Sequence, residues 1–431
     1  MNFNKNNIIC VIGLGYVGLP LAMAFGKKFS TFGYDISDSR INNLKKKFDN
    51  TGTFKELSFR KAKYLTFSKS PSCISASNFV IICLPTPVNR YNRPDLGILL
   101  DGVKLVGKYL KKNTTIIFES TVYPTTTETV CIPLLEKFSN LTHKKDFYVG
   151  YSPERINPGD KEHVLENIIK VVSGDTKNTL KKIKNLYETI INVGVFSATD
   201  IKTAETAKII ENTQRDLNIS LMNELSIICH KLNIKTKNVL DAAKTKWNFL
   251  NFRPGLVGGH CIGVDPYYLA YLSRKIGHEP LVINAGRKVN DSMPKYIINK
   301  IIFNLKKKNI SLKKSKLIFL GVSFKKNCSD IRNSKIFEVI KFFDSKVSNI
   351  EIIDPLIDIN DLGQHKSKVK DWENLKYKYN ILVISSYHDE FKNIKPNNMR
   401  SKILGDGIVF DIMSELDDNY IKRLKREVWQ L

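Results

Sequence analysis

The chain is 431 residues long, which is enough for about three domains and excludes a small scaffold that needs disulfides for stability. Its 68 lysines and arginines against 42 acidic residues give a net charge of +26. The lysines lie in short runs throughout the chain without interleaved aromatic residues, so we expect solvated surface and no nucleic-acid partner. No apolar run approaches the length of a membrane span, and the 7 cysteines have neither zinc-site nor disulfide spacing. We therefore expect a cytoplasmic protein without membrane insertion or a bound metal.

The first segment predicts a strand, a tight glycine turn, a helix and a second strand. An apolar run over 7–12 leads into GLGYVG at 13–18, followed by a helix-like segment over 21–29 and a short strand over 31–35. In this context the glycines let the turn close, the backbone meet a pyrophosphate and the helix pack tightly. Asp35 stands where a carboxylate binds an adenosine ribose and repels a 2′-phosphate, so we predict NAD. A glycine turn without a ligand is the alternative.

Three further apolar strands, over 79–84, 114–118 and 147–150, each run into a polar motif. Ligands of open α/β sheets lie beyond the carboxyl ends of the strands, so these motifs should face the cofactor. The third motif contains Glu154 and Arg155 in a proline-bracketed loop, which suits a catalytic carboxylate. An ordinary turn with a surface ion pair is equally compatible with these residues.

The pattern then changes to a long helix over 199–232. Lys208, Asn212 and Arg215 are spaced at i, i+4 and i+7 and share one face of this helix. Such a face is commonly the solvated side of a helix. A long helix between two α/β halves also often forms a dimer seam, whose inward polar edge could line a site.

A glycine-rich stretch over 254–268 contains one thiol, Cys261, with Asp265 four residues later. Glycine allows close approach to a ligand, but a lone cysteine is more often a small buried hydrophobe and paired glycines a turn. Beyond it we predict a basic, apolar helix over 294–308 and a second α/β unit. Its strands are predicted over 316–320, 350–353, 380–385 and 408–412. No GxGxxG heads this half, so we expect no second dinucleotide.

Five ordered motifs give the chain its resemblance to a known family. They are GLGYVG at 13–18, ESTVYP at 119–124, YSPERINPGD at 151–160, GGHCIGVDP at 258–266 and GVSFKKNCSDIR at 321–332. With these motifs the chain resembles the UDP-glucose/GDP-mannose dehydrogenase family over nearly its whole length. The forms SPERINPGD, WNFLNFRPGLVGGHCIGVDPYYL and AGRKVND (285–291) look most like the branch that acts on UDP-N-acetylhexosamines.

The resemblance implies a fold and its domains. Two Rossmann-like doubly wound α/β domains are expected, joined by a central helical dimerisation domain, with boundaries at 1–198, 199–308 and 309–431. The first domain would bind NAD, the second would carry the Cys261 loop, and the third would bind the UDP-sugar. A homodimer or higher homo-oligomer is expected through the long helix.

The resemblance also implies a reaction. The C6 hydroxyl of UDP-GlcNAc or UDP-GalNAc would be oxidised to a carboxylate with two successive NAD molecules, for synthesis of a capsule or O-antigen polysaccharide. Cys261 would form a thiohemiacetal and then a thioester. UDP-ManNAc and UDP-glucose are alternative substrates, although Val264 and the segment 411–413 depart from the glucose branch. A two-electron dehydrogenase of the same fold, or a basic nucleic-acid binder with a vestigial dinucleotide fold, are more distant alternatives.

Residue roles follow by resemblance at matching positions. Catalysis would use Cys261 as nucleophile, Lys208 and Asn212 at the O6 oxygen, Thr121 and Asp265 to hold a water, and Glu154 in thioester hydrolysis. NAD would be bound by Gly13, Gly15, Tyr16, Val17, Gly18, Asp35, Arg40, Thr86, Thr121 and Arg332, the last from the same or a neighbouring subunit. The UDP-sugar would be bound by Arg155, Ile156, Lys208, Asn212, Arg215, Arg253, Gly255, Phe324 and Lys325. His260 is left without a role.

Overall fold

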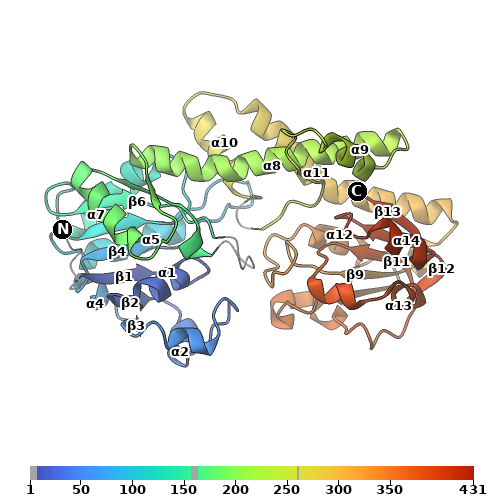
Figure 1. Ribbon diagram of the computed structural model, residues 1–431, viewed down its shortest axis with the longest axis horizontal. Coiled ribbons are helices and arrows are strands. Elements are labelled where there is room, and N and C mark those ends of the chain that lie inside the picture. Colours follow the sequence, from blue (N-terminus) through green and yellow to red (C-terminus); the bar gives the residue numbers. More distant parts are fainter. Residues whose placement is uncertain (1–6, 157–163, 260–261) are drawn as a thin grey trace. The chain divides into compact units, whose positions relative to one another are not determined.

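The computed structural model describes residues 7–156, 164–259 and 262–431 (Figure 1). The predicted nucleophile Cys261 and its neighbour His260 lie outside the described residues. The chain divides into two compact units, Met1–Glu211 with Tyr267–His278 and Asn212–Pro266 with Glu279–Leu431. They are called the first and the second unit below.

The first unit is built on an eight-stranded sheet in the order β3-β2-β1-β4-β5-β6-β7-β8. The strands are β1 (Ile8–Ile12), β2 (Ser30–Tyr34), β3 (Leu65–Ser68), β4 (Phe79–Ile82), β5 (Thr115–Phe118), β6 (Tyr148–Tyr151), β7 (Lys170–Gly174) and β8 (Val195–Ser197). All neighbours are parallel except β6 and β7, which are antiparallel. The strand order reverses between β1 and β4, and such a switch point is where open α/β sheets bind their ligands.

Both faces of this sheet are buried. Ile9 and Val11 of β1 belong to one apolar cluster, whereas Cys10 and Ile12 belong to another on the opposite face. The helical segments that precede the long helix are α1 (Gly18–Phe25), α2 (Asp38–Lys45), α3 (Glu56–Phe59), α4 (Ser72–Ser75), α5 (Gly97–Tyr109), the π-helical η1 (Thr127–Cys131), α6 (Ile132–Ser139), the 3-10 turn η2 (Leu165–Asn167) and α7 (Lys177–Glu188). Continuous apolar strands covered by helices on both sides are typical of a parallel sheet.

The second unit is built on a five-stranded, fully parallel sheet in the order β10-β9-β11-β12-β13. The strands are β9 (Lys316–Leu320), β10 (Asn349–Ile353), β11 (Tyr379–Ile384), β12 (Ile403–Asp411) and β13 (Glu427–Gln430). Its helical segments after α11 are η3 (Leu312–Lys314), α12 (Ile336–Phe343), η4 (Ile359–Lys368), η5 (Asp389–Asn393), α13 (Pro396–Ser401) and α14 (Asp418–Leu424). The residues of β9 again alternate between two apolar clusters, so this sheet is also covered on both faces.

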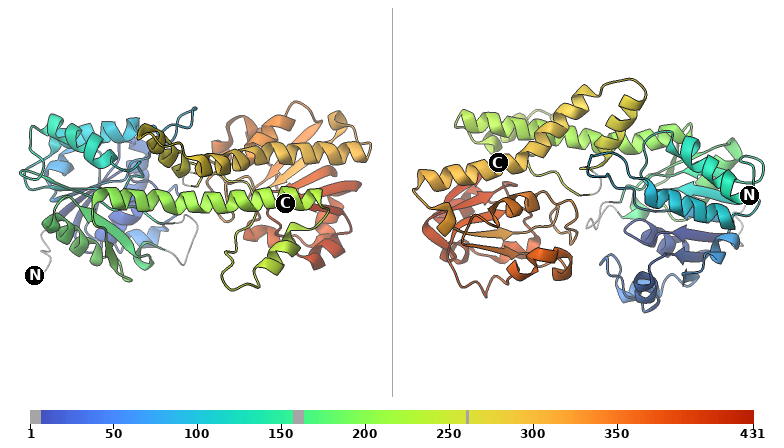
Figure 2. Two further views of the ribbon diagram at one scale, coloured as in Figure 1. Left: turned by 90° about the horizontal axis from the view of Figure 1, so that it is seen from above. Right: turned by 180° about the vertical axis from the view of Figure 1, so that it is seen from behind.

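Between the sheets in sequence lie α8 (Ile201–Lys231), α9 (Thr236–Ala243), α10 (Asp265–Lys275) and α11 (Leu281–Lys307). In the second unit, α8 lies beside α11, as both views of Figure 2 show, and buried polar groups join them. Arg287 of α11 donates to Asp216 of α8 at 2.6 Å, and Asn223 of α8 donates to Asn290 of α11 at 2.8 Å. Among the described residues, no helix is long and apolar enough to cross a membrane.

The predicted fold class is confirmed: two doubly wound α/β units with long helices between them in the chain. Most predicted strands agree with the structure to within two residues, but β3, β7, β8 and β13 were not predicted, and β12 begins five residues before its predicted start at 408.

Two helix predictions were wrong in extent. Helix α1 covers Gly18–Phe25 where 21–29 was predicted, and α11 begins at Leu281, well before the predicted 294. Pro294 lies inside α11, although proline is usual at the first turn of a helix, where its missing N–H costs nothing. The first half of α11 also buries Arg287 and Asn290, which interrupt the apolar period.

Candidate functional site

The glycine turn after β1 has the geometry that a dinucleotide needs. Gly13 has φ +87°, and a Cβ there would lie 2.6 Å from the Cys83 carbonyl oxygen, while a Cβ on Gly18 would lie 1.8 Å from the Gly13 oxygen. A Cβ on Gly15 would meet no atom within 4 Å. The first and third glycines are therefore required by the protein's own packing. The second faces open space at the start of α1, where a pyrophosphate can approach the backbone.

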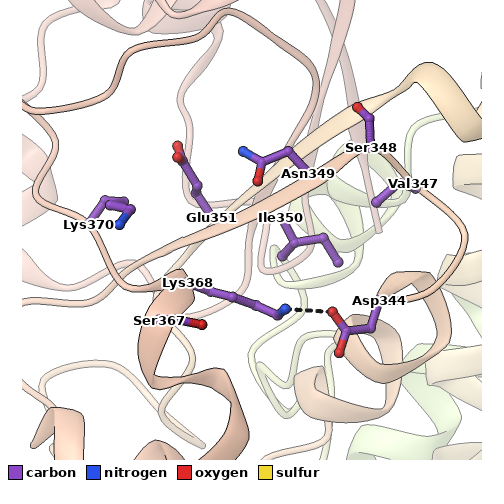
Figure 3. Close-up of a pocket in the computed structure, with 9 residues that line it drawn as sticks. All are labelled: Asp344, Val347, Ser348, Asn349, Ile350, Glu351, Ser367, Lys368 and Lys370. Atoms are coloured by element: carbon purple, nitrogen blue, oxygen red, sulfur yellow. Dashed lines mark ion pairs between the residues drawn. The ribbon is translucent and has the colours of Figure 1, made fainter.

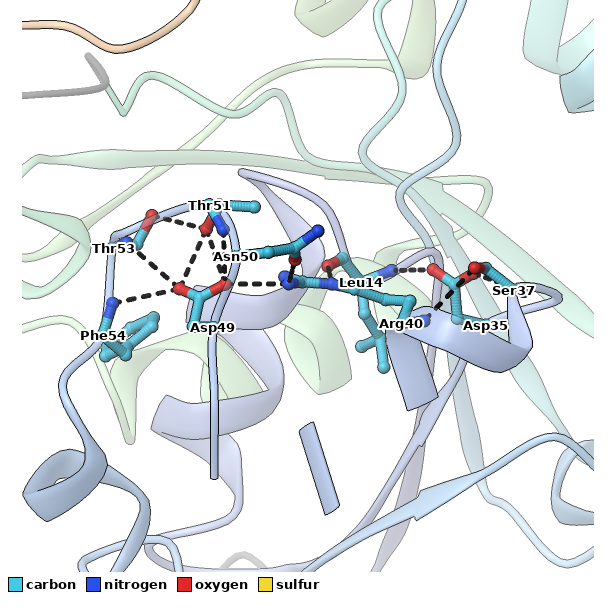
Figure 4. Close-up of polar contacts among 9 residues, drawn as sticks. All are labelled: Leu14, Asp35, Ser37, Arg40, Asp49, Asn50, Thr51, Thr53 and Phe54. Carbon is cyan, nitrogen blue, oxygen red and sulfur yellow. Dashed lines mark hydrogen bonds and ion pairs between the residues drawn. The ribbon is translucent and has the colours of Figure 1, made fainter. Parts of the chain in front are cut away.

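Asp35 follows β2 and lies against this turn (Figure 4). One carboxylate oxygen accepts the Leu14 N–H at 2.9 Å and the other accepts the Ser37 N–H at 2.9 Å. The side chain is half-buried, so the carboxylate is both oriented by the turn and open to a ligand. This placement fits the predicted contact with an adenosine ribose.

Arg40 was predicted to contact NAD, but the structure gives it partners within the protein. The residue is buried, its Nε donates to the Leu14 carbonyl at 2.8 Å, and its Nη1 donates to Asp49 at 2.8 Å and also to Asn50. Figure 4 shows Arg40 between Asp49 and the glycine turn. Asp49 in turn accepts the backbone N–H groups of Thr51, Thr53 and Phe54. Arg40 thus ties the glycine turn to the segment that follows α2.

The motifs after β4 and β5 meet at the carboxyl edge of the sheet. The Thr86 hydroxyl donates to the Thr121 carbonyl at 2.6 Å, and the Leu84 N–H donates to the Ser120 hydroxyl at 2.9 Å. Tyr268 of α10 donates to the Thr86 carbonyl at 2.8 Å. Thr86 and Thr121, both predicted to contact NAD, are therefore joined by a hydrogen bond from the side chain of one to the backbone of the other.

Glu154 is held by charged and backbone groups. It is buried, its Oε1 accepts the N–H groups of Arg155 and Ile156 at 2.6 and 2.7 Å, and its Oε2 accepts Lys170 Nζ at 2.9 Å. The same ammonium donates to Glu119 at 2.6 Å. Arg155, predicted to bind substrate, forms an ion pair with Glu211 of α8.

The pKa values of this cluster are perturbed. Burial raises the pKa of Glu119 to about 7, although Lys170 opposes the shift. Burial by itself would lower the pKa of Lys170, but the carboxylates of Glu119 and Glu154 outweigh it, so the pKa is raised. The ammonium therefore stays charged through neutral pH, whereas Glu119 titrates near neutrality.

On α8, Lys208 and Asn212 are buried and lie one turn apart, whereas Arg215 is exposed. Asn212 donates to the buried carboxylate of Asp265 at 2.6 Å. One turn before Lys208, Glu205 accepts the N–H groups of Thr125, at 2.6 Å, and Thr127, at 3.0 Å. Burial raises the pKa of Glu205 to about 7. Thr125 has φ +81°, which is unusual for a β-branched residue, so Glu205 holds a strained turn just after the motif 119–124.

In the second unit, the loop that leads to Cys261 is clamped at Gly255. Asn223 donates to the Gly255 carbonyl at 3.0 Å and accepts its N–H at 2.8 Å. Gly259 has φ +82°, and a Cβ there would lie 2.6 Å from the Phe324 ring. The predicted substrate residues Gly255 and Phe324 are therefore brought to the same loop, while Arg253 is exposed.

The motif 321–332 follows β9 and repeats part of the glycine-turn geometry. Asp354, after β10, accepts the Val322 N–H at 2.7 Å, just as Asp35 accepts the Leu14 N–H in the first unit. The Asp354 carboxylate is fully buried beside His388, whose Nδ1 accepts the Asn327 N–H at 2.9 Å. The Asp354 carboxylate is therefore less open to a ligand than the half-buried carboxylate of Asp35.

Two predicted cations of this motif lie toward solvent. Arg332 makes a two-pronged contact with Asp330, at 2.9 and 2.6 Å, and its side chain is 55% exposed. Lys325 is half-buried. Both remain accessible to an anionic ligand.

A pocket of about 250 Å³ in the second unit lies away from these motifs (Figure 3). It lies at the amino end of β10 and is lined by Asn349, Glu351 and Lys370, among others, with an ion pair of 2.7 Å between Lys368 and Asp344. Ligands of open parallel sheets bind at the carboxyl edge, so this pocket is not the candidate substrate site.

Sequence reasoning assigned no role to Glu119, Lys170, Glu205 or Asn223. A signal was present for Lys170, which is a single cation in the apolar run Ile168-Ile169-Lys170-Val171-Val172. A charge in such a strand requires a buried partner. The partners lie on other strands, so the sequence pattern could not identify them.

Comparison with known proteins places all three parts of the chain. Models of the UDP-glucose/GDP-mannose dehydrogenase family match at its NAD binding domain (residues 7–191), central domain (202–292) and UDP binding domain (318–418). Protein CapL of Staphylococcus aureus is 44% identical over 99% of this chain and 100% of its own length. The UDP-N-acetyl-D-glucosamine 6-dehydrogenase of Salmonella typhi is 45% identical over 94% of this chain and 95% of its own.

Solved structures agree over nearly the whole chain. The UDP-D-ManNAc dehydrogenase of Pyrococcus horikoshii covers 98% of both chains with a TM-score of 0.87 and 26% identity. The UDP-N-acetyl-mannosamine dehydrogenase Cap5O of Staphylococcus aureus covers 98% of both chains with a TM-score of 0.83 and 28% identity.

Proposed function

Because the chain belongs to the UDP-glucose/GDP-mannose dehydrogenase family, we propose that it oxidises C6 of a UDP-N-acetylhexosamine, UDP-GlcNAc or UDP-GalNAc, to the uronic acid with NAD. The substrate class is supported by relatives named UDP-N-acetyl-D-glucosamine 6-dehydrogenase, at 45% and 42% identity. The observation that carries the proposal is the 2.6 Å hydrogen bond from Asn212 to Asp265, which ties the helix of Lys208 to the segment just after Cys261.

The residues of the first unit fit the cofactor. Gly15 leaves open space beside the amino end of α1, and Asp35 presents a half-buried carboxylate to the same turn. When bound, NAD accepts a hydride from the sugar carbon. The protein's part is to hold the pyrophosphate on backbone N–H groups and the ribose on Asp35, and so to orient the cofactor.

At the sugar, we propose that the protein's residues stabilise charge and hold the reacting groups in position. Lys208 is buried and cationic, so it can stabilise negative charge on O6 as the hydroxyl proton leaves, with the Asn212 amide one turn away. Asp265 is buried and hydrogen-bonded to that amide, which fixes the orientation of both groups. Thr121 and Asp265 are proposed to hold a water near the reacting carbon.

Cys261 is proposed as the nucleophile of the second oxidation. Its thiol adds to the carbonyl of the C6 aldehyde and forms a thiohemiacetal, from which a second hydride and a proton leave to give a thioester. Water then adds to the thioester, the C–S bond breaks, and the thiol, a carboxylate and one proton are released. These steps together remove four electrons from the sugar, as two hydrides. The acid product suits synthesis of a surface polysaccharide such as a capsule or O-antigen.

The test is formation of NADH with UDP-GlcNAc, UDP-GalNAc, UDP-ManNAc, UDP-glucose and GDP-mannose. We expect the highest kcat/KM with UDP-GlcNAc or UDP-GalNAc, two NADH per sugar, and no acid product from Cys261→Ala despite intact NAD binding. UDP-ManNAc is the alternative substrate, since relatives at 30–32% identity carry that name. One NADH per sugar in the unmodified enzyme would instead indicate a two-electron dehydrogenase.

We also propose a homodimer through α8. Ile210, Leu221 and Ile228 are 49%, 59% and 49% exposed, and their spacing of eleven and seven residues puts them on one face of the helix. A stripe of large apolar side chains on a long helix is typical of an interface between subunits.

A further inference from the structure

Lys170 joins two carboxylates that come from different strands of the first sheet. It is the first residue of β7, is 2% exposed, and donates to Glu119, directly after β5, and to Glu154, after β6. Tyr187 of α7 donates a further hydrogen bond to Glu119. Within the described part of the chain, Lys170 is thus the shared cationic partner of both buried acids.

The contacts of Glu154 leave little freedom for its carboxylate. Oε1 accepts two backbone N–H groups of its own loop, and Oε2 accepts the ammonium of Lys170. A carboxylate that is 7% exposed is costly to keep ionised without a cation, because burial disfavours the charged form. Removing the ammonium would therefore leave this buried carboxylate without its cation, and Oε2 could turn away from its present position.

The other partner of Lys170 differs in its charge near neutrality. Burial raises the pKa of Glu119 to about 7, so this acid is protonated in part of the population, while the raised pKa of Lys170 keeps the ammonium charged. Lys170 therefore acts as a fixed counter-ion for the two acids. It differs from the cation of a surface ion pair because all three groups are buried.

We propose that Lys170 is a positioning residue for hydrolysis of the sugar thioester, holding the Glu154 carboxylate in one orientation to accept a proton from the attacking water. In that step the water oxygen bonds to the thioester carbon, one water proton passes to Glu154, the C–S bond breaks, and the sulfur of Cys261 leaves as a thiolate. No electrons are transferred to or from the cofactor. This inference rests on the proposed function.

The deciding variant is the double substitution Lys170→Met with Glu119→Gln. It removes one cation and one carboxylate together, so the formal charge of the cluster is unchanged and no second acid is left buried without a partner. Lys170→Arg is the conservative variant, since it keeps a cation between the same two strands. Glu119→Gln alone is the control, because it keeps the contact between Lys170 and Glu154.

Each enzyme is mixed with saturating NAD and its best UDP-sugar, and NADH is followed through the first turnover while quenched protein is weighed by mass spectrometry. For the double variant we expect a burst of two NADH per active site, a steady-state rate lower by about tenfold to a hundredfold, and a sugar adduct on the protein. KM for NAD should stay within about twofold of the wild-type value. Lys170→Arg should recover most of the rate, and Glu119→Gln should form no adduct.

An unchanged steady-state rate in the double variant would overturn the inference. So would a loss of the burst together with weaker NAD binding, because that pattern would show that Lys170 only supports the fold. Neither result would contradict the expected yield of two NADH per sugar in the wild-type enzyme. One NADH per sugar in the wild type would overturn the proposed function, and the role of Lys170 with it.

Discussion

Substitution of Asp49 by alanine tests whether Arg40 acts on NAD directly or through the glycine turn. The Arg40 and Asp49 side chains are 9% and 0% exposed, and their atoms lie 2.8 Å apart. Breaking a buried ion pair by removing one partner costs about 3–5 kcal/mol, because the other charge is left buried without compensation. The backbone N–H groups of the segment 51–54 also lose their carboxylate acceptor. They add less to the cost, since that segment can reach water.

In Asp49→Ala the guanidinium loses its carboxylate partner and retains the neutral oxygens of Asn50 and Leu14, so we expect it to turn toward water and to give up its bond to the Leu14 carbonyl. Suppose that about 3 kcal/mol of this cost destabilises the ordered conformation of the glycine turn that binds NAD. The affinity for NAD then decreases by about a hundredfold, at about 1.4 kcal/mol for each tenfold. We expect this loss in calorimetric titration with NAD, with KM for the UDP-sugar changed little.

The matched control is Asp38→Ala, on the helix α2 that carries Arg40. Its carboxylate pairs with Lys69 at 2.6 Å, but both side chains are more than half exposed, so its removal should cost less than about 1 kcal/mol. If Asp49→Ala binds NAD as tightly as the control does while Arg40→Ala binds it weakly, the reasoning is refuted. Arg40 would then contact the cofactor directly, as the sequence predicted.

Four further outcomes can be measured. Gly18→Ala should reduce both thermal stability and NAD binding because its Cβ would lie 1.8 Å from a backbone oxygen, whereas Gly15→Ala, with no atom within 4 Å, should keep its stability and lose NAD affinity alone. Because burial raises the pKa of Glu205 to about 7 from an ordinary 4.5, its contribution to stability is fully present below about pH 4.5 and is lost as the pH rises through about 7. Melting temperatures of Glu205→Gln should therefore fall less over this range than those of the wild type; parallel curves would contradict the assignment. Asn223→Ala leaves two buried backbone groups of one glycine without partners, at about 1–3 kcal/mol each, and should raise KM for the UDP-sugar by about tenfold or more while KM for NAD stays the same. Leu221→Asp should convert a dimer to a monomer in sedimentation, and a wild type that is active as a monomer would refute the proposed interface.

The fold was largely predictable because its local signals agree with one another. Apolar runs such as those at 8–12 and 316–320 are too continuous for half-exposed strands, and they alternate with helical segments, which together predict a parallel sheet covered on both faces. The strands that were missed carry weaker signals. Strand β13 at the sheet edge has no fully buried residue, and β8 has only three residues.

The candidate site was predictable only where a motif is local. The glycine turn and Asp35 are 22 residues apart at most, and their contact follows from consecutive parallel strands with the acid at the end of the second. The contact between Arg40 and Asp49 was less predictable, because Asp49 lies in a loop without regular structure. The predicted helix was shorter than α11 for a similar reason. In the sequence, Arg287 and Asn290 look like part of a solvated segment, whereas in the structure they are buried and their partners lie on α8.

By itself, the sequence determined most of the strands of the two sheets, the NAD-type turn, and the motifs that identify the family, because each of these depends on residues close together in the chain. Only the tertiary structure decided which charges meet. Lys170 and Glu119 are separated by 51 positions, and Asn223 and Gly255 by 32. Such contacts depend on which strands become neighbours in the sheet and on which helix covers them. The packing of whole helices and strands decides which polar groups meet. The apolar pattern that drives this packing does not depend on which polar residues lie at the ends of the elements.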